Sequence, residues 1–316
     1  MQKKIFARPL LDHTAIETFL VGCLSMGKNY GCRTGQTFTA DNIVKMIRDA
    51  ESAVGQTMQD PTFSSTRNRV PKYREDAARE ELREIVLTEL ITKDRLDDDE
   101  KITLGTGGAK PKQSVPLADL KAYFVIGLPA SGKSTLINEI ADKLGAMILD
   151  SDFAKRKLPE FDNTPAGANL VHKESSTIIW GNEEDRPSLF EYCKTLGLNV
   201  VVPTIGQDYA DLNAKCDLFI AAGYSVHLTT TTLSRESATI RALERFLTTG
   251  RYVPLGLIFD AYANDPLLNY YRIRVESFEK ANSKWASFGA ISTSTSPVTI
   301  SDCTNDSNPA NLLRSA

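Results

Sequence analysis

The sequence predicts an α/β protein in which a parallel β-sheet is covered by helices on both faces and is preceded by a helical region. Three observations predict this fold. From residue 120 onward, short runs rich in β-branched and aromatic residues alternate with helical patterns of about 10 to 15 residues. A glycine-rich turn joins the first of these runs to the helix that follows it. Residues 13–96, in contrast, carry apolar residues mainly at helical spacing.

These patterns divide the chain into four segments. They are a helical N-terminal region (1–98), a linker (99–118), an α/β domain (119–288) and a Ser/Thr-rich tail (289–316). The linker is first acidic and then rich in glycine and proline, which is typical of a boundary. The tail has little apolar periodicity, so we expect it to be loosely ordered.

The N-terminal region predicts three helices and shows no chemically reactive pattern. Residues 13–53 give two helices separated by a turn near Gly31, and residues 72–96 give a longer amphipathic helix. In the linker, Gly105–Gly108 followed by Lys110 allows two interpretations. The segment is either a plain connection or a backbone that approaches a phosphate group.

Strands and helices alternate within the α/β domain. The expected strands are 122–127, 146–150, 199–204 and 224–232, and the main expected helices are 134–145, 209–223 and 234–250. Parallel strands need crossover connections between them, so this order favours a parallel sheet with helices on both faces.

Composition excludes several classes of protein. Lysine and arginine number 37 against 40 aspartates and glutamates, a net charge of -3, which argues against a nucleic-acid-binding surface. The five cysteines never show CxxC spacing and only three histidines are present, so we expect neither a disulfide framework nor a zinc site, and a reducing compartment. No apolar run approaches the roughly 20 residues of a membrane helix, so we expect a soluble protein without a secretory signal.

The strongest motif is Gly-Leu-Pro-Ala-Ser-Gly-Lys-Ser at 127–134, which matches GxxxxGK[ST] between a strand and a helix. Backbone N–H groups and the helix N-terminus favour phosphate there, whereas a turn without a ligand is the alternative. We expect Lys133 to reach the β- and γ-phosphates and Ser134 to ligate Mg²⁺. The nucleotide-binding residues predicted from this loop are Gly127, Pro129, Ala130, Ser131, Gly132, Lys133, Ser134 and Thr135.

Two carboxylates follow the second strand, at Asp150 and Asp152. Nucleotide switches and motors usually carry an aspartate at the end of another apolar strand, but here the strand at 199–204 ends in Pro203 and Thr204. A carboxylate close to the phosphate loop suits a P-loop kinase instead, in which one of the two aspartates faces the γ-phosphate as the base; we name Asp150 as the candidate metal ligand. The alternative is that the pair only caps the next helix.

Residues 127–161 (GLPASGKSTLINEIADKLGAMILDSDFAKRKLPEF) and VHKESS at 171–176 resemble the zeta-toxin family of P-loop kinases. The resemblance covers roughly residues 120–260. It implies a kinase that uses ATP or GTP with Mg²⁺ and in which Asp152 deprotonates a sugar hydroxyl. Family members that phosphorylate UDP-N-acetylglucosamine act as toxins, many of them held in check by an antitoxin. The resemblance therefore implies a cytoplasmic bacterial protein or an effector delivered into a host cell, with an antitoxin or chaperone as partner.

Two arginines extend the resemblance. ALERF at 242–246 resembles the end of a family helix whose arginine stabilises the transferring phosphate, which points to Arg245. TTGRYVP at 248–254 resembles the family's glycine-rich lid, which implies that Arg251 also stabilises the transferring phosphate. Phosphoryl transfer needs such cations, although each arginine alone also suits a solvated helix end.

The sequence departs from the family where substrate-binding members carry a Glu-Gly-Thr-like triplet. This chain has Val-Pro-Thr-Ile-Gly at 202–206. Thr204 replaces the hydroxyl of the family's triplet, but Pro203 cannot replace its carboxylate. The sugar nucleotide is therefore in doubt as the substrate, and NAD, which an effector branch of the family phosphorylates, is a second acceptor to test. His172 either contacts substrate or packs locally, and Lys155 either touches an anionic acceptor or lies on a solvated face.

The leading hypothesis is thus a small-molecule kinase that acts on a nucleotide sugar or a dinucleotide. A polynucleotide kinase shares the loop, the aspartate and the lid arginine, but the acidic net charge argues against it. A nucleotide-gated interaction protein, with the N-terminal helices as its effector arm, is the third candidate.

Overall fold

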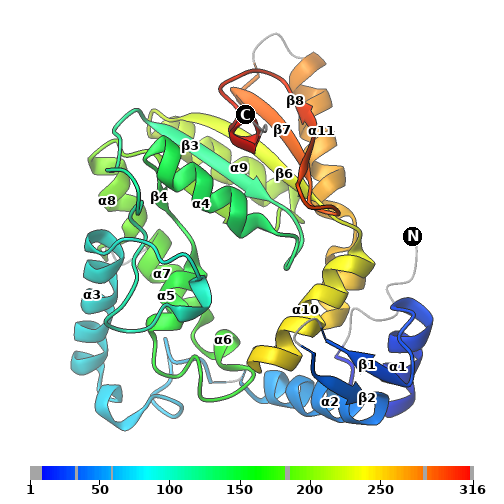
Figure 1. The fold of residues 1–316 in the computed structure, drawn as a ribbon. Coiled ribbons are helices and arrows are strands. Elements are labelled where there is room, and N and C mark those ends of the chain that lie inside the picture. Colours follow the sequence, from blue (N-terminus) through cyan, green and yellow to red (C-terminus); the bar gives the residue numbers. More distant parts are fainter. Residues whose placement is uncertain (1–8, 33–34, 58–59, 182–185, 280–282, 314–316) are drawn as a thin grey trace.

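The computed structural model describes residues 9–313 except 33–34, 58–59, 182–185 and 280–282. Its centre is a six-stranded sheet in the order β4-β5-β3-β6-β7-β8 (Figure 1). The strands are β3 (Lys121–Ile126), β4 (Met147–Ile148), β5 (Val200–Thr204), β6 (Ser225–Thr232), β7 (Ser287–Ser292) and β8 (Thr299–Cys303). All neighbours are parallel except β7 and β8, so the predicted α/β sheet is confirmed, with one antiparallel edge strand added.

Strand β3 lies at the centre because its sequence is apolar on both faces. Five of its six residues, Ala122–Ile126, are buried. It pairs with β5 on one side and with β6 on the other, so Ala122 lies beside both Val200 and Val226. Its C-terminal end, where the phosphate loop begins, is thereby fixed in the middle of the sheet.

Helices cover both faces of the sheet. The chain runs from β3 through α4 (Lys133–Leu144) to β4 in one direction, and from β5 through α9 (Tyr209–Ala221) to β6 in the other. Right-handed crossovers therefore place α4 and α9 on opposite faces. Phe219 of α9 is the centre of an aromatic cluster, with its ring 5.4 Å from Phe124 and 5.1 Å from Phe190.

The first described residues, from Leu10 onward, pack around helix α10 (Arg235–Thr249) rather than on the sheet. They form α1 (His13–Thr18), a π-helical turn (Phe19–Cys23) and α2 (Ala40–Thr57), with a hairpin of β1 (Asn29–Gly31) and β2 (Thr37–Thr39) between them. The predicted helices are present, but the expected turn near Gly31 is part of this hairpin. Buried side chains of both parts, such as Phe19, Ile47 and Phe246, form one core.

Helix α3 (Asp76–Thr92) belongs to a different core, next to α5 (Ser151–Lys157) and α7 (His172–Trp180). The short helix α6 (Gly167–Leu170) contacts α2, while α8 (Leu189–Thr195) packs on α7. Helix α11 (Asp265–Glu279) packs on β6 and follows a π-helical turn (Leu257–Tyr262). The described part of the predicted helical region 1–98 is therefore shared between two cores.

The predicted linker and tail are both built into the fold. Gly108 packs so closely on α3 that a Cβ atom there would lie 2.0 Å from the Lys93 carbonyl oxygen, and Lys157 Nζ donates to the carbonyls of Thr103 and Thr106. Gly105–Gly108 therefore contact α3 and its C-terminal end and do not line the cavity at the phosphate loop, which favours the interpretation as a plain connection.

The expectation of a loosely ordered tail is wrong, because residues 287–303 form β7 and β8. Threonine and serine are compatible with a strand, but their polarity conceals the alternation by which strands are recognised. The chain then returns to the sheet through a 3₁₀ turn (Pro309–Leu313) that packs on α4. Two further 3₁₀ turns, Pro71–Tyr73 and Asp99–Lys101, flank α3. Among the described helices, none is long and apolar enough to cross a membrane.

Candidate active site

The phosphate loop borders a cavity of about 500 Å³ at the carboxyl ends of β3, β4 and β5. Gly132 precedes α4 in a left-handed conformation with φ of 83°, and Ala130 has φ of 60°. Gly127 has no room for a side chain, since a Cβ atom there would lie 2.2 Å from Thr231 Oγ1. The glycines at 127 and 132 thus allow the chain to turn sharply from strand to helix.

Lys133 lies folded along this loop. Its Nζ donates hydrogen bonds to the carbonyl oxygens of Gly127 at 2.7 Å and Leu128 at 2.8 Å. Burial lowers the pKa of Lys133 to about 8, although the negative charges of Asp150 and Asp152 oppose this effect. A phosphate at the loop would restore the full positive charge of Lys133.

Most of the residues predicted to bind nucleotide line the cavity. These are Pro129, Ala130, Ser131, Gly132, Lys133 and Ser134. Gly127 lies at the base of the loop, where its carbonyl holds Lys133. Thr135 is exposed and does not line the cavity.

Two threonines outside the motif hold the loop in place. The Thr231 and Ser131 hydroxyls lie 2.7 Å apart, and Thr293 Oγ1 donates to the Ser131 carbonyl at 2.7 Å. Thr231 comes from β6, and Thr293 directly follows β7. Sequence analysis gave neither residue a role, because their contacts depend on strand order.

The aspartate pair stands across the cavity from the loop. Asp150 caps α5 by accepting from the Asp152 N–H at 2.8 Å, so the helix-cap interpretation describes Asp150 correctly. Burial and the adjacent charge of Asp152 raise the pKa of Asp150 to about 6. The side chain of Asp152 takes no part in this cap.

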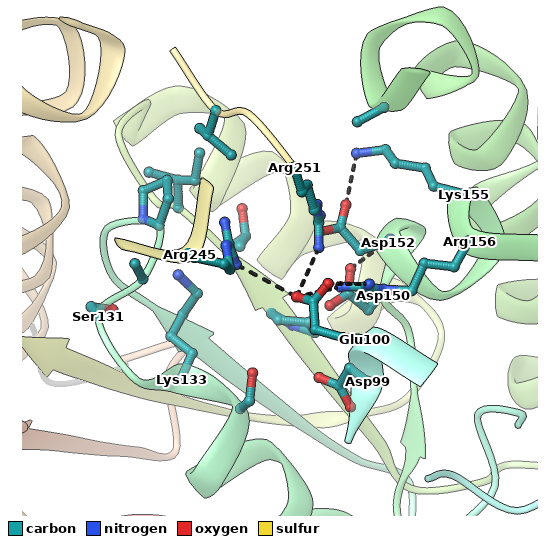
Figure 2. Close-up of a pocket in the computed structure, with 18 of the residues that line it drawn as sticks. Asp99, Glu100, Ser131, Lys133, Asp150, Asp152, Lys155, Arg156, Arg245 and Arg251 are labelled. Atoms are coloured by element: carbon teal, nitrogen blue, oxygen red, sulfur yellow. Dashed lines mark hydrogen bonds and ion pairs between the residues drawn. The ribbon is translucent and has the colours of Figure 1, made fainter. Parts of the chain in front are cut away.

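Asp152 is held in its ionised form by two cations. Its Oδ1 accepts from Lys155 Nζ at 2.8 Å, and its Oδ2 accepts from Arg251 at 2.5 Å (Figure 2). Burial works against the charge, but Lys155 and Arg251 prevail and hold the pKa of Asp152 well below its usual range.

Arg245 and Arg251, both predicted from the family resemblance, converge on the same cavity. They meet an acid that sequence analysis missed, Glu100, which also binds Arg156 (Figure 2). Arg156 is 7% exposed and therefore does not lie on a solvated helix face.

Asp99 and Glu100 lie in the predicted linker, within the acidic run 97–100. The charge of this run was visible in the sequence, but its position beside the phosphate loop was not. Asp99 Oδ1 is buried without a hydrogen-bond partner, and the same carboxylate interacts with Ser134. Oxygen ligands of this kind suit Mg²⁺, so Ser134, Asp150 and Asp99 fit a magnesium site in this cavity.

The residues predicted to contact the acceptor line the same cavity. Thr204 stands at the end of β5 next to Pro203, and Lys155 points from α5. His172 begins α7 at the exposed rim of the cavity. Partial burial and the charge of Lys155 lower the pKa of His172, so its imidazole is neutral near pH 7. The segment Tyr252–Pro254, which follows Arg251, also lines the cavity.

Comparisons with known proteins bear on the family and the fold of this chain. Residues 109–265 match the family model of the zeta toxins. A search of curated proteins finds no match. Among solved structures, this chain is similar to a chain in the structure of the PezAT chromosomal toxin–antitoxin system of Streptococcus pneumoniae. The two share 13% identity with a TM-score of 0.50, over 76% of this chain and 87% of that chain.

A second similar structure is the native AvrRxo1-ORF1:AvrRxo1-ORF2 complex. It shows 14% identity and a TM-score of 0.45, over 77% of this chain and 72% of that chain. At 13% identity, the PezAT structure shows a common fold only. The family model, in contrast, spans the phosphate loop, the aspartate pair, Arg245 and Arg251. Through residues 109–265, the chain therefore belongs to the zeta-toxin family of P-loop kinases.

Proposed function

We propose that this chain transfers the γ-phosphate of ATP or GTP to a hydroxyl group of a nucleotide sugar or a dinucleotide. One observation carries the proposal. The phosphate loop with Lys133 and the ionised Asp152 line the same cavity, together with Arg245 and Arg251. A kinase needs a donor site, a base and cations in this relation, whereas a helix cap or a solvated helix end would not bring them together.

Each residue has one task in the proposed reaction. The loop amides and Lys133 bind the donor phosphates, and Arg245 and Arg251 stabilise charge on the transferring group. The acceptor oxygen forms a bond to the γ-phosphorus as the bond to the β-phosphate oxygen breaks, and Asp152 takes the acceptor's proton. A phosphate that draws Arg251 away from Asp152 would make this carboxylate a stronger base.

Mg²⁺ belongs to the same proposal. Ser134 would hold it through its hydroxyl, and Asp150 and Asp99, which line the same cavity, would supply carboxylate oxygens. When bound, the metal neutralises phosphate charge. The unpartnered buried oxygen of Asp99 supports this assignment, because a buried carboxylate oxygen without a partner is costly.

The acceptor is anionic in this proposal, with UDP-N-acetylglucosamine and NAD as the two candidates. Lys155 and the neutral His172 suit a diphosphate and its sugars, and Thr204 supplies a hydroxyl. Pro203, where the family pattern has a carboxylate, favours testing NAD beside the nucleotide sugar. We also propose that the chain acts as a toxin or an effector. Its partner would be an antitoxin or a chaperone, and it would act in the bacterial cytoplasm or in a host cell. The toxin–antitoxin origin of the PezAT structure supports that role.

The test is to incubate the full chain with labelled ATP or GTP and a pool of bacterial and plant metabolites, and to identify the product by mass. The pool contains both candidate acceptors and a DNA oligonucleotide with a free 5′-hydroxyl. We expect a phosphorylated nucleotide sugar or dinucleotide. A phosphorylated oligonucleotide would indicate a polynucleotide kinase, and nucleotide hydrolysis without any product would indicate a nucleotide-gated interaction protein.

Variants then separate the roles of the two aspartates. Asp152→Asn removes the proton acceptor, so transfer should fall by on the order of a hundredfold while nucleotide still binds. Asp150→Asn should weaken Mg²⁺-dependent nucleotide binding as well as turnover. Lys133→Ala should abolish transfer in a folded protein. Equal and mild effects of both aspartate variants on binding and on transfer would contradict the proposed mechanism.

A further inference from the structure

Glu100 stands where a kinase of this kind binds phosphate. It belongs to the short 3₁₀ turn Asp99–Lys101, which reaches the cavity from the segment between α3 and β3. Arg156 contacts both of its carboxylate oxygens, at 2.7 and 3.0 Å. Arg251 lies 3.3 Å and Arg245 3.9 Å from its Oε1. Figure 2 shows the three guanidinium groups directed at this one carboxylate.

The three arginines have more donors than Glu100 can satisfy. The Nε atoms of Arg156, Arg245 and Arg251 are all buried without a hydrogen-bond partner. A carboxylate has two oxygens, whereas a phosphoryl group presents three to the surrounding donors and carries more negative charge. A phosphoryl group therefore matches this cluster better than the carboxylate does.

The Glu100 side chain can leave the arginines while the turn that carries it stays in place. The Glu100 side chain is 34% exposed, whereas those of Arg156 and Arg251 are 6% and 12% exposed. The turn has three residues and is capped by Asp98, which accepts from the Glu100 N–H at 3.0 Å. Displacing Glu100 thus exposes little apolar surface, since its main contacts here are with the arginines.

We propose that Arg156, Arg245 and Arg251 form a single subsite for a phosphoryl group, and that Glu100 occupies this subsite until a phosphate displaces it. The inference rests on the proposed function and extends it in two ways. Arg156 becomes a third phosphate-binding arginine, and binding of a phosphorylated ligand is opposed by an acid of the chain itself. Release of Glu100 also frees Arg251, which bridges Glu100 and Asp152.

The test measures binding of inorganic pyrophosphate and of ATP to the full chain by calorimetry, at fixed ionic strength and without acceptor. Glu100→Gln removes the competing charge and keeps the shape, so both ligands should bind about tenfold more tightly. Asp97→Asn is the matched control, because this nearby acid pairs with Arg95 and Lys112 instead.

A second pair of variants tests Arg156. In the Glu100→Gln background, Arg156→Ala should weaken pyrophosphate binding about tenfold, because only the phosphate contact is then lost. Unchanged binding in that background would show that Arg156 merely anchors Glu100, and the three-arginine subsite would be refuted.

Failure of this inference is distinguishable from failure of the proposed function. If Glu100→Gln binds pyrophosphate equally or more weakly, Glu100 positions the arginines and does not compete with phosphate, which overturns the inference. ATP binding that still depends on Lys133 would then leave the kinase proposal intact. If neither the unmodified chain nor any variant binds ATP or pyrophosphate, both proposals fall.

Discussion

His227 on β6 is a buried imidazole in a setting that favours its neutral form. Its ring stacks on Tyr123 at 5.2 Å, and its Nδ1 lies 2.7 Å from the Ser287 hydroxyl. Burial, helped by the charge of Lys121, lowers the pKa of His227 to about 4. In the unfolded chain the imidazole titrates near its ordinary value of about 6.5. Acid therefore protonates the unfolded chain before the folded protein.

This difference predicts a pH-dependent loss of stability. The contribution of His227 is fully present above about pH 6.5 and is lost as the pH falls toward 4, amounting to about 3 kcal/mol. His227→Gln should lower the melting temperature at pH 7.5 but flatten its decline between pH 6.5 and 4.5. The exposed His13→Gln serves as control. Parallel melting curves for His227→Gln and the unmodified chain would contradict the assignment.

Among the elements, α3 is held against α7 and against the segment that follows α5, mainly by Arg79. Arg79 donates to Glu160 at 2.8 and 2.9 Å and to Glu174 at 2.6 and 2.7 Å, and all three side chains are fully buried. Arg83 and Thr62 also contact Glu174. Because Glu174 lies two residues after His172, this network also fixes the rim of the candidate active site.

Arg79→Met should therefore destabilise the protein strongly. It leaves two carboxylates buried without their main partner, which costs about 3–5 kcal/mol, far more than an exposed ion pair is worth. Thermal or urea unfolding measures the loss. Arg67→Met, which breaks an exposed pair with Asp60, should change stability by less than about 1 kcal/mol. Similar unfolding midpoints for the two variants would show that the buried network is not needed.

At the scale of the whole molecule, the sequence predicted what depends on residues close together in the chain. The phosphate loop and Asp152 could be found because a motif and a strand–helix order specify them locally. Glu100, Thr231 and Thr293 could not, because strand order and the path of the predicted linker bring them to the loop. Polar strands such as β8 escaped notice because their pairing partners, and not their own apolar pattern, determine them.

The C-terminal part of the chain belongs to the same structural unit as the phosphate loop. Asn308 is buried and donates to the Leu228 carbonyl at 3.2 Å and the Ser287 hydroxyl at 3.0 Å. Its Oδ1 accepts from the Thr229 hydroxyl and from the Ala310 N–H, both at 3.0 Å. It thus ties β6 and β7 to the last turn of the described chain.

This tie predicts that Asn308→Ala weakens both stability and nucleotide binding. The substitution leaves buried groups of β6 and β7 unpaired, at a cost of about 1–3 kcal/mol for each group that finds no water. Thr293, one residue beyond β7, holds the Ser131 carbonyl of the phosphate loop, so a shift of β7 should loosen the loop. We expect a lower melting temperature and weaker ATP binding by calorimetry, whereas Ser307→Ala, exposed and bonded only to Asn305, should change neither. A stable Asn308→Ala variant with unchanged ATP affinity would mean that this end of the chain is separable from the phosphate site after all.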